Sequence, residues 1–229
     1  MIVEDAFWSL FPEAMIGTVT VRGVDNRAAA EIGGQWLADQ IEITAAALGE
    51  AEIGSHPAVA PWRAAYQRFG VKPSKTRSSI ESLLRSAKAG RLRSINPLVD
   101  LYNVVSLKHL LPCGGEDLDR LAGDLRLTRA AGDEPFVPLG GIDNEPPPPG
   151  AVIYRDDLGV VCSCWNWREA DRTKLTEATT DAVLVIEALP PISRAALDAA
   201  LNELAAFVTT HLGGTAAVEI ATSREDGPR

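Results

Sequence analysis

The chain has 229 residues, of which 46% are hydrophobic and 23% charged, and its formal net charge is −9. No apolar run approaches the ~20 residues of a membrane helix, so we expect a soluble protein without a membrane partner, folded as a single domain over residues 1–229. The acidic start MIVEDAFWSLF lacks the basic region of a secretory signal, which favours a cytoplasmic location.

Charge is distributed unevenly along the chain. Residues 61–130 hold 13 Lys and Arg against 6 Asp and Glu, whereas the remainder holds 9 against 25. Such asymmetry indicates contact with a polyanion, although solvated charged helices also produce it. The 3 cysteines and 3 histidines show no zinc-binding spacing, so we expect no metal.

Hydrophobic periodicity predicts an alternation of strands and helices. In chain order we expect a strand at 14–24, helices at 27–48 and 56–69, a helix after Ser78, another after Asn96, and a short strand at 125–127. A proline-rich loop with Pro146–Pro149 then precedes a hairpin of strands 151–155 and 160–166. A strand at 181–189, a helix capped by Ser193 and a strand at 216–221 follow, and we expect residues 222–229 to be disordered.

The two central helices carry clear end signals. Ser74 or Ser78 can cap the first of them, Ser78 with Glu81 at the spacing of a capping box, and Gly90 is placed to end that helix. Asn96 and Pro97 form a second N-cap and first turn. The region 68–125 therefore joins a basic amphipathic helix to a more apolar one.

Two polar residues interrupt apolar elements. Asn103 lies within the second central helix and requires a partner in the protein or in a ligand. Glu187 shares one strand face with Val183, Val185 and Leu189. Its carboxyl group must be paired or solvated in a cavity, unless it lies at the rim of the sheet.

Several chemical motifs are absent or incomplete. GVKPSKT imitates a phosphate-binding loop, but Ser74 replaces the glycine before the lysine and no strand precedes it. There is no GxGxxG, GxSxG or HExxH. The glycine doublets at 114–115 and 140–141 allow either a ligand close to the backbone or a tight turn.

The order of four segments resembles a known module. PSKTRSSIESLL, RLRSINPLVDLYNVVSL, LPCGGEDLDRL and TTDAVLVIEAL occur as in the B3/B4 module of the bacterial phenylalanyl-tRNA synthetase β subunit, over roughly residues 65–190. The chain is similar to free-standing B3/B4-domain proteins. The resemblance implies an α+β fold, with a β-sandwich-like mixed sheet core flanked by helices. In the synthetase the module hydrolyses tRNA mischarged with tyrosine.

The resemblance also implies roles for individual residues. Asn103 matches a pocket asparagine, and Glu187 matches the acidic residue that reads the misattached amino acid, so the two would face each other across a pocket. Gly114 stands where the synthetase has a histidine, and Trp165, Asn166 and Trp167 stand near its glycine-rich pocket wall. At these positions the chain departs from the synthetase pattern, so the resemblance does not extend to specificity for tyrosine.

We therefore expect a tRNA-binding, editing-like module that hydrolyses a mischarged aminoacyl-tRNA in trans, with no cofactor and no DNA partner. Positioning of a water and donors for the oxyanion suffice for such a reaction. The alternatives are a non-catalytic RNA-binding module, or a pocket for a free amino acid or small amide. The candidate residues are catalytic (Asn103, Glu187, Asn166, Thr173), substrate-binding (Gly114, Gly140, Gly141, Trp165, Arg172) and RNA-binding (Lys75, Arg77, Arg85, Arg91, Arg93).

Overall fold

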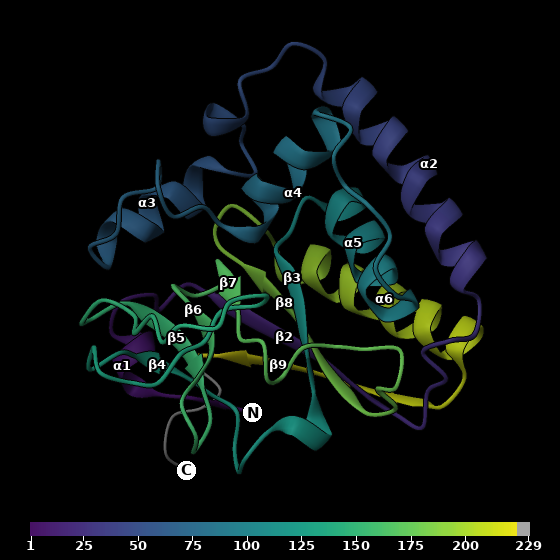
Figure 1. The fold of residues 1–229 in the computed structure, drawn as a ribbon. Coiled ribbons are helices and arrows are strands. Elements are labelled where there is room, and N and C mark those ends of the chain that lie inside the picture. Colours follow the sequence, from purple (N-terminus) through teal and green to yellow (C-terminus); the bar gives the residue numbers. More distant parts are fainter. Residues whose placement is uncertain (224–229) are drawn as a thin grey trace.

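A four-stranded antiparallel sheet lies at the centre of the fold, in a computed structural model that describes residues 1–223 (Figure 1). Its strands follow the order β3 (Cys113–Asp117), β8 (Ala182–Ala188), β2 (Met15–Arg22) and β9 (Thr215–Thr222). Every residue of β8 is buried, because neighbouring strands cover both its edges and other layers cover both its faces.

The alternation of side chains along β8 divides the core in two. Ala182, Leu184, Ile186 and Ala188 belong to one apolar cluster with the inner face of the last helix, α6 (Arg194–Leu212). Val183, Val185 and Leu189 belong to a second cluster, shared with the other sheet. A strand with period two must place Glu187 on this second face, between the two sheets.

The second sheet has five strands in the order β1 (Ile2–Val3), β4 (Arg126–Arg129), β5 (Val152–Arg155), β6 (Val160–Ser163) and β7 (Arg168–Glu169). β1 pairs with β4 in parallel and the other pairs are antiparallel. The predicted α+β fold with a mixed sheet core flanked by helices is therefore confirmed; the four-stranded sheet is antiparallel throughout.

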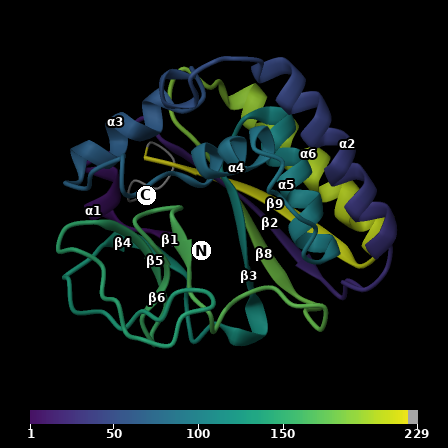
Figure 2. The ribbon, with the colours of Figure 1, turned by 45° about the horizontal axis from the view of Figure 1, so that its top comes forward.

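The helices form two groups (Figures 1 and 2). α2 (Ala30–Leu48), α5 (Pro97–His109) and α6 lie together over the outer face of the four-stranded sheet. α3 (Ala60–Arg68) and α4 (Ser79–Lys88) lie at one end of the sheets, and the short α1 (Asp5–Trp8) lies beside β4. Single 3-10 turns occur at Ile53–Ser55 and Leu118–Arg120. Within the described residues, no helix combines the length and the hydropathy needed to span a bilayer.

The predicted N-caps of α4, α5 and α6 are confirmed, whereas the helices expected from residues 27 and 56 begin only at Ala30 and Ala60. The Ser78 hydroxyl accepts a hydrogen bond from the Glu81 N–H, and the Asn96 side chain accepts one from the Val99 N–H. Ser193 caps α6 in the same way. Gly90 follows α4 with a φ of 63°, a left-handed conformation that glycine adopts at little cost.

Other predictions of local structure were wrong or incomplete. β1, β3 and β7 were missed; Gly114 and Gly115 lie within β3 rather than in a turn. β6 ends at Ser163 instead of continuing to residue 166, because Cys164 and Trp165 adopt φ values of 50° and 67°. Thr222 belongs to β9 and the Ser223 hydroxyl donates to the Pro12 carbonyl at 2.7 Å, so disorder was wrongly expected for them. The rest of the tail, residues 224–229, lies outside the described residues.

Candidate active site between the two sheets

Glu187 accepts two hydrogen bonds across the inter-sheet space, both from residues of the five-stranded sheet and its β6–β7 turn. The Tyr154 hydroxyl, from β5, donates to Oε1 at 2.6 Å, and Asn166 Nδ2 donates to Oε2 at 2.5 Å. The Glu187 side chain is only 3% exposed. The carboxyl group is thus buried and paired, and its placement at a solvated rim of the sheet is excluded.

This environment tunes the acidity of Glu187. Burial raises its pKa to about 7, since the charged form loses hydration, and the Glu169 carboxyl raises the pKa as well. The hydrogen bonds from Tyr154 and Asn166 act in the opposite direction. A carboxylate that titrates near neutral pH is suited to accept a proton in catalysis.

The turn after β6 positions Asn166. Tyr66 donates to Asn166 Oδ1 at 2.9 Å and the Ser79 N–H donates to the same oxygen at 3.2 Å. The amide oxygen is thereby occupied, and the NH₂ group must face Glu187. The backbone of Ser79, at the start of α4, is therefore linked to Glu187 through one side chain.

Trp165 anchors that turn. Its ring is fully buried and lies 5.0 Å from Phe7, 4.8 Å from Phe11 and 4.9 Å from Trp62, between centroids. Two consecutive non-glycine residues with positive φ are a strained arrangement that surrounding packing must maintain. The Trp165 side chain supplies that packing.

Two further carboxyl groups lie next to Glu187. Glu116 in β3 is 4% exposed, and Glu169 in β7 is half-buried. Burial raises the pKa of both, and the Glu169 carboxylate raises the pKa of Glu116 further. Because each ionised carboxyl group disfavours ionisation of the other, the pair favours a state in which the two share one proton. A Cβ atom at Gly114 would lie 2.9 Å from Glu169 Oε1, so the absence of a side chain at Gly114 leaves the space that Glu169 fills.

Three cavities meet around these groups. The smallest, about 30 Å³, is lined by Glu187, Asn166, Glu116 and Glu169 and has room for a water molecule with polar partners. A second, about 250 Å³, lies between α4 and α5 and is lined by hydroxyl and amide side chains: Ser79, Ser82, Ser86, Asn103, Ser106 and Asn166. Glu169 lines both.

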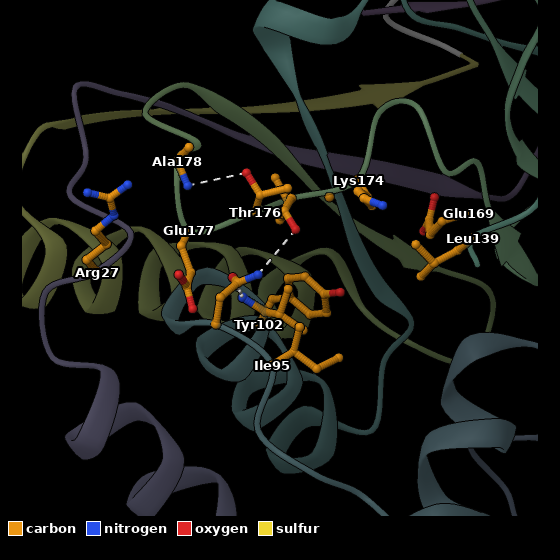
Figure 3. Close-up of a pocket in the computed structure, with 13 residues that line it drawn as sticks. Arg27, Ile95, Tyr102, Leu139, Glu169, Lys174, Thr176, Glu177 and Ala178 are labelled. Atoms are coloured by element: carbon orange, nitrogen blue, oxygen red, sulfur yellow. Dashed lines mark hydrogen bonds between the residues drawn. The ribbon is translucent and has the colours of Figure 1, made fainter.

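The third cavity, of about 560 Å³, is drawn in Figure 3. Glu169, Leu139 and Lys174 lie at one end of it, Tyr102 lies in the middle and Arg27 lies at the other end. Glu169 is common to all three cavities and Tyr102 to the two larger ones. Glu169 therefore adjoins two cavities large enough for a ligand and one that is the size of a water molecule.

The structure brings together some of the predicted catalytic residues. Asn166 contacts Glu187 directly. Asn103 lines the neighbouring 250 Å³ cavity, and the hydrogen bonds to Glu187 come from Tyr154 and Asn166 instead. Thr173 is fully buried beside Glu116.

The predicted substrate-binding residues are more dispersed. Gly114 and Trp165 line the smallest cavity. Arg172 forms two hydrogen bonds to the buried Asp156, at 2.8 and 2.5 Å, and so fixes the β5–β6 hairpin. Gly140 and Gly141 follow Leu139, and the Gly141 N–H closes a turn onto the Pro138 carbonyl at 2.8 Å. Of the two interpretations of Gly140 and Gly141, a close approach of a ligand or a tight turn, the structure shows the tight turn.

The predicted RNA-binding residues fall into two groups. Glu81, fully buried, binds Arg85 at 2.9 Å and Arg63 at 2.7 Å, and Arg77 lies 3.7 Å away. Arg93 donates to the carbonyls of Gly90 and Leu92. In the part of the chain that the structure describes, the exposed side chains of Lys75 and Arg91 have no bonded partner, so they are the freest cations of the set.

Tyr154, Glu116 and Glu169 were missed by sequence reasoning. Tyr154 occupies an ordinary strand position, and Glu169 belongs to the polar run after Trp165, which has the composition of an exposed loop. Nothing in the sequence indicates that residues from β3, β5 and β7 lie close together in the fold. Across residues 1–223 no group of three His, Cys, Asp or Glu side chains has the arrangement of a metal site.

The chain has an α+β fold in which helices flank a mixed five-stranded sheet and an antiparallel four-stranded sheet. The family model for the B3/4 domain matches residues 61–221, and the chain belongs to that family. Among solved structures, it is similar to an N-terminal fragment of the phenylalanyl-tRNA synthetase β subunit from Pyrococcus horikoshii, at 12% identity and a TM-score of 0.47. That match covers 94% of this chain and 49% of the other, so the chain spans about half the length of its relative. A search of curated proteins gives no match.

Proposed function

We propose that this chain is a tRNA-binding module that hydrolyses the ester of a mischarged aminoacyl-tRNA in trans. The observation that carries the proposal is Glu187: a buried carboxyl group with a pKa of about 7, oriented by Tyr154 and Asn166 beside a water-sized cavity. Membership of the B3/4 family relates the chain to a synthetase module and supports the choice of substrate.

The reaction follows from this geometry. Ionised Glu187 takes a proton from a water in the small cavity, and the water oxygen bonds to the ester carbonyl carbon. The bond from that carbon to the ribose oxygen then breaks, Glu187 returns its proton to the ribose oxygen, and free amino acid and tRNA leave. Asn166 holds the base in place rather than binding the substrate.

The edge strand β3 offers a donor for the oxyanion. The Asp117 N–H points away from β8, to the Thr173 carbonyl at 2.9 Å. By the two-residue period of a strand the Gly115 N–H points the same way, and Gly115 lines both the 30 Å³ and the 560 Å³ cavities. An N–H group so placed stabilises a developing negative charge on the carbonyl oxygen.

A deacylation assay with a panel of mischarged tRNAs tests the proposal. We expect at least one aminoacyl-tRNA to be hydrolysed at a rate well above its spontaneous rate, by catalytic amounts of protein. Absence of turnover on every member of the panel, from protein with a cooperative unfolding transition, would refute it.

The basic region gives a second expected result. Replacing Lys75 and Arg91 with Ala should weaken tRNA binding and reduce the slope of log Kd against log salt by about 2, one for each phosphate group that is no longer neutralised. Thermal stability should be unchanged, since neither side chain is bonded. Arg85→Ala is the matched variant: because Glu81 is fully buried, it should lower stability by about 1–3 kcal/mol. An unchanged salt slope in the double variant would contradict the proposed binding of RNA by this region.

A pocket for a free amino acid or small amide is the second candidate. The pairing of Arg77 and Arg85 with Glu81 favours it, because part of the positive charge of α4 is neutralised within the protein. If this candidate is correct, replacing Lys75, Arg77 and Arg85 with Ala leaves catalysis on a small ester or amide unchanged, and tRNA does not compete.

A further inference from the structure

Among residues 1–223, Glu169 and the carboxyl groups beside it form no ion pair, although the positive charge of Arg172 lowers the pKa of Glu116. Arg168, Arg172 and Lys174 all lie within a few residues of Glu169, yet each binds a different acid: Glu145 at 2.7 Å, Asp156 at 2.5 Å and Asp171 at 2.9 Å, respectively. No ion pair in the described part of the chain involves Glu116, Glu169 or Glu187.

Two carboxyl groups that line the cavities each have an oxygen without a hydrogen-bond partner in the described part of the chain. Glu116 Oε2 and Glu169 Oε2 are buried and have no hydrogen-bond partner among the described residues. The Thr173 hydroxyl beside Glu116 and the Cys162 thiol beside Glu169 each lower the pKa of the neighbouring carboxyl group. The Glu116 side chain is more than nine-tenths buried and lines the smallest cavity, and Glu169 lines all three. Buried acceptors without donors are costly unless a proton or a ligand satisfies them.

The surroundings fit a compact cation. Gly114, without a side chain, lets the Glu169 carboxyl reach the backbone of β3, and Tyr102 lines the two larger cavities beside it. A carboxyl pair that holds one proton carries a single negative charge, which a primary ammonium group can neutralise with three N–H donors. An N–H group bound there lies next to the water-sized cavity and Glu187.

We infer that Glu169, supported by Glu116, binds the free α-ammonium group of an aminoacyl ester, so that the site accepts substrates with an unblocked amine and rejects their neutral counterparts. This rests on the proposed hydrolysis of an aminoacyl ester and names the part of the substrate that the site recognises. In this arrangement Glu169 binds the ammonium group of the substrate, and Glu187 activates the attacking water.

The test uses hydrolysis-resistant 3′-amide analogues of aminoacyl-adenosine, prepared for each amino acid of the deacylation panel. Each analogue is matched by an α-hydroxy compound in which a hydroxyl group replaces the ammonium group, so that size is conserved and charge is removed. Calorimetric titration of the full chain should show the amine bound about 10-fold or more tightly than its hydroxy partner. Glu169→Gln should reduce this preference to about threefold or less.

Two variants complete the design. Glu145→Gln, at an acid that pairs with Arg168 on the surface, should keep the full preference. If Glu169→Gln fails to fold, Glu116→Gln provides the same readout, with a reduced preference expected. Equal binding of amine and hydroxy analogues by the unmodified protein, a preference that survives in the Glu169 or Glu116 variant, or no binding of either analogue would overturn the inference.

The outcome separates this inference from the proposed function. Amine preference without hydrolysis of any aminoacyl-tRNA refutes the editing reaction and leaves ammonium recognition in place. Hydrolysis without amine preference refutes ammonium recognition alone.

Discussion

Glu187→Gln is expected to reduce the rate of aminoacyl-tRNA hydrolysis by about 10²- to 10⁴-fold, the usual contribution of a general base. The amide has nearly the volume of the carboxyl group, and it can still accept from Asn166 while it donates to the Tyr154 oxygen. The fold should persist, so the loss reports on chemistry. Single-turnover rates on the best substrate of the panel measure it.

The pH dependence of the same rate identifies the base. With a pKa of about 7 for Glu187, the rate of the unmodified protein should rise with pH through that value and level off above it, because only the carboxylate accepts a proton. Tyr154→Phe removes a hydrogen bond that lowers this pKa, so its profile should shift to higher pH. A Glu187→Gln variant that keeps its rate within threefold, or a Tyr154→Phe profile that does not move, would exclude this role.

Local signals explain how much of the fold was predictable. Ser78, Asn96 and Ser193 act through hydrogen bonds to residues three positions away, so a single sequence contains the whole interaction. β3 was missed because its pairing with β8 joins residues 113–117 to 182–186, and the Gly114–Gly115 doublet has low strand propensity. The short β1 and β7 likewise exist only through their partners.

The candidate site shows the same limit. Glu187 was identified because it is a charged residue within an otherwise apolar strand, a pattern that can be read directly from the sequence. Asn166 was proposed, but its hydrogen bond to Glu187 depends on the turn before it, in which Cys164 and Trp165 have positive φ values. The sequence does not predict this turn, because positive φ is usually recognised from a glycine and neither residue is one. Tyr154, Glu116 and Glu169 come from three strands, and only the stacking of the sheets brings them together.

Trp165→Ala is expected to lower the free energy of unfolding by about 3–5 kcal/mol, the range for truncation of a large aromatic side chain in a core. Trp165 is fully buried against Phe7, Phe11 and Trp62, so the substitution opens a cavity where three segments meet. Urea titration followed by circular dichroism measures the change.

The same substitution should also impair hydrolysis under conditions where the variant remains folded, because the Cys164–Trp165 turn then loses the packing that directs Asn166 towards Glu187. Ile142→Ala is the matched control: its side chain is 92% exposed, so its effect on stability should stay within about 0.5 kcal/mol. If Trp165→Ala and Ile142→Ala lower stability equally, the aromatic cluster does not hold the turn. If Trp165→Ala destabilises the protein but its folded form hydrolyses the ester at the original rate, the packing of Trp165 is independent of the site, because Asn166 then keeps its position through Tyr66 and Ser79 alone.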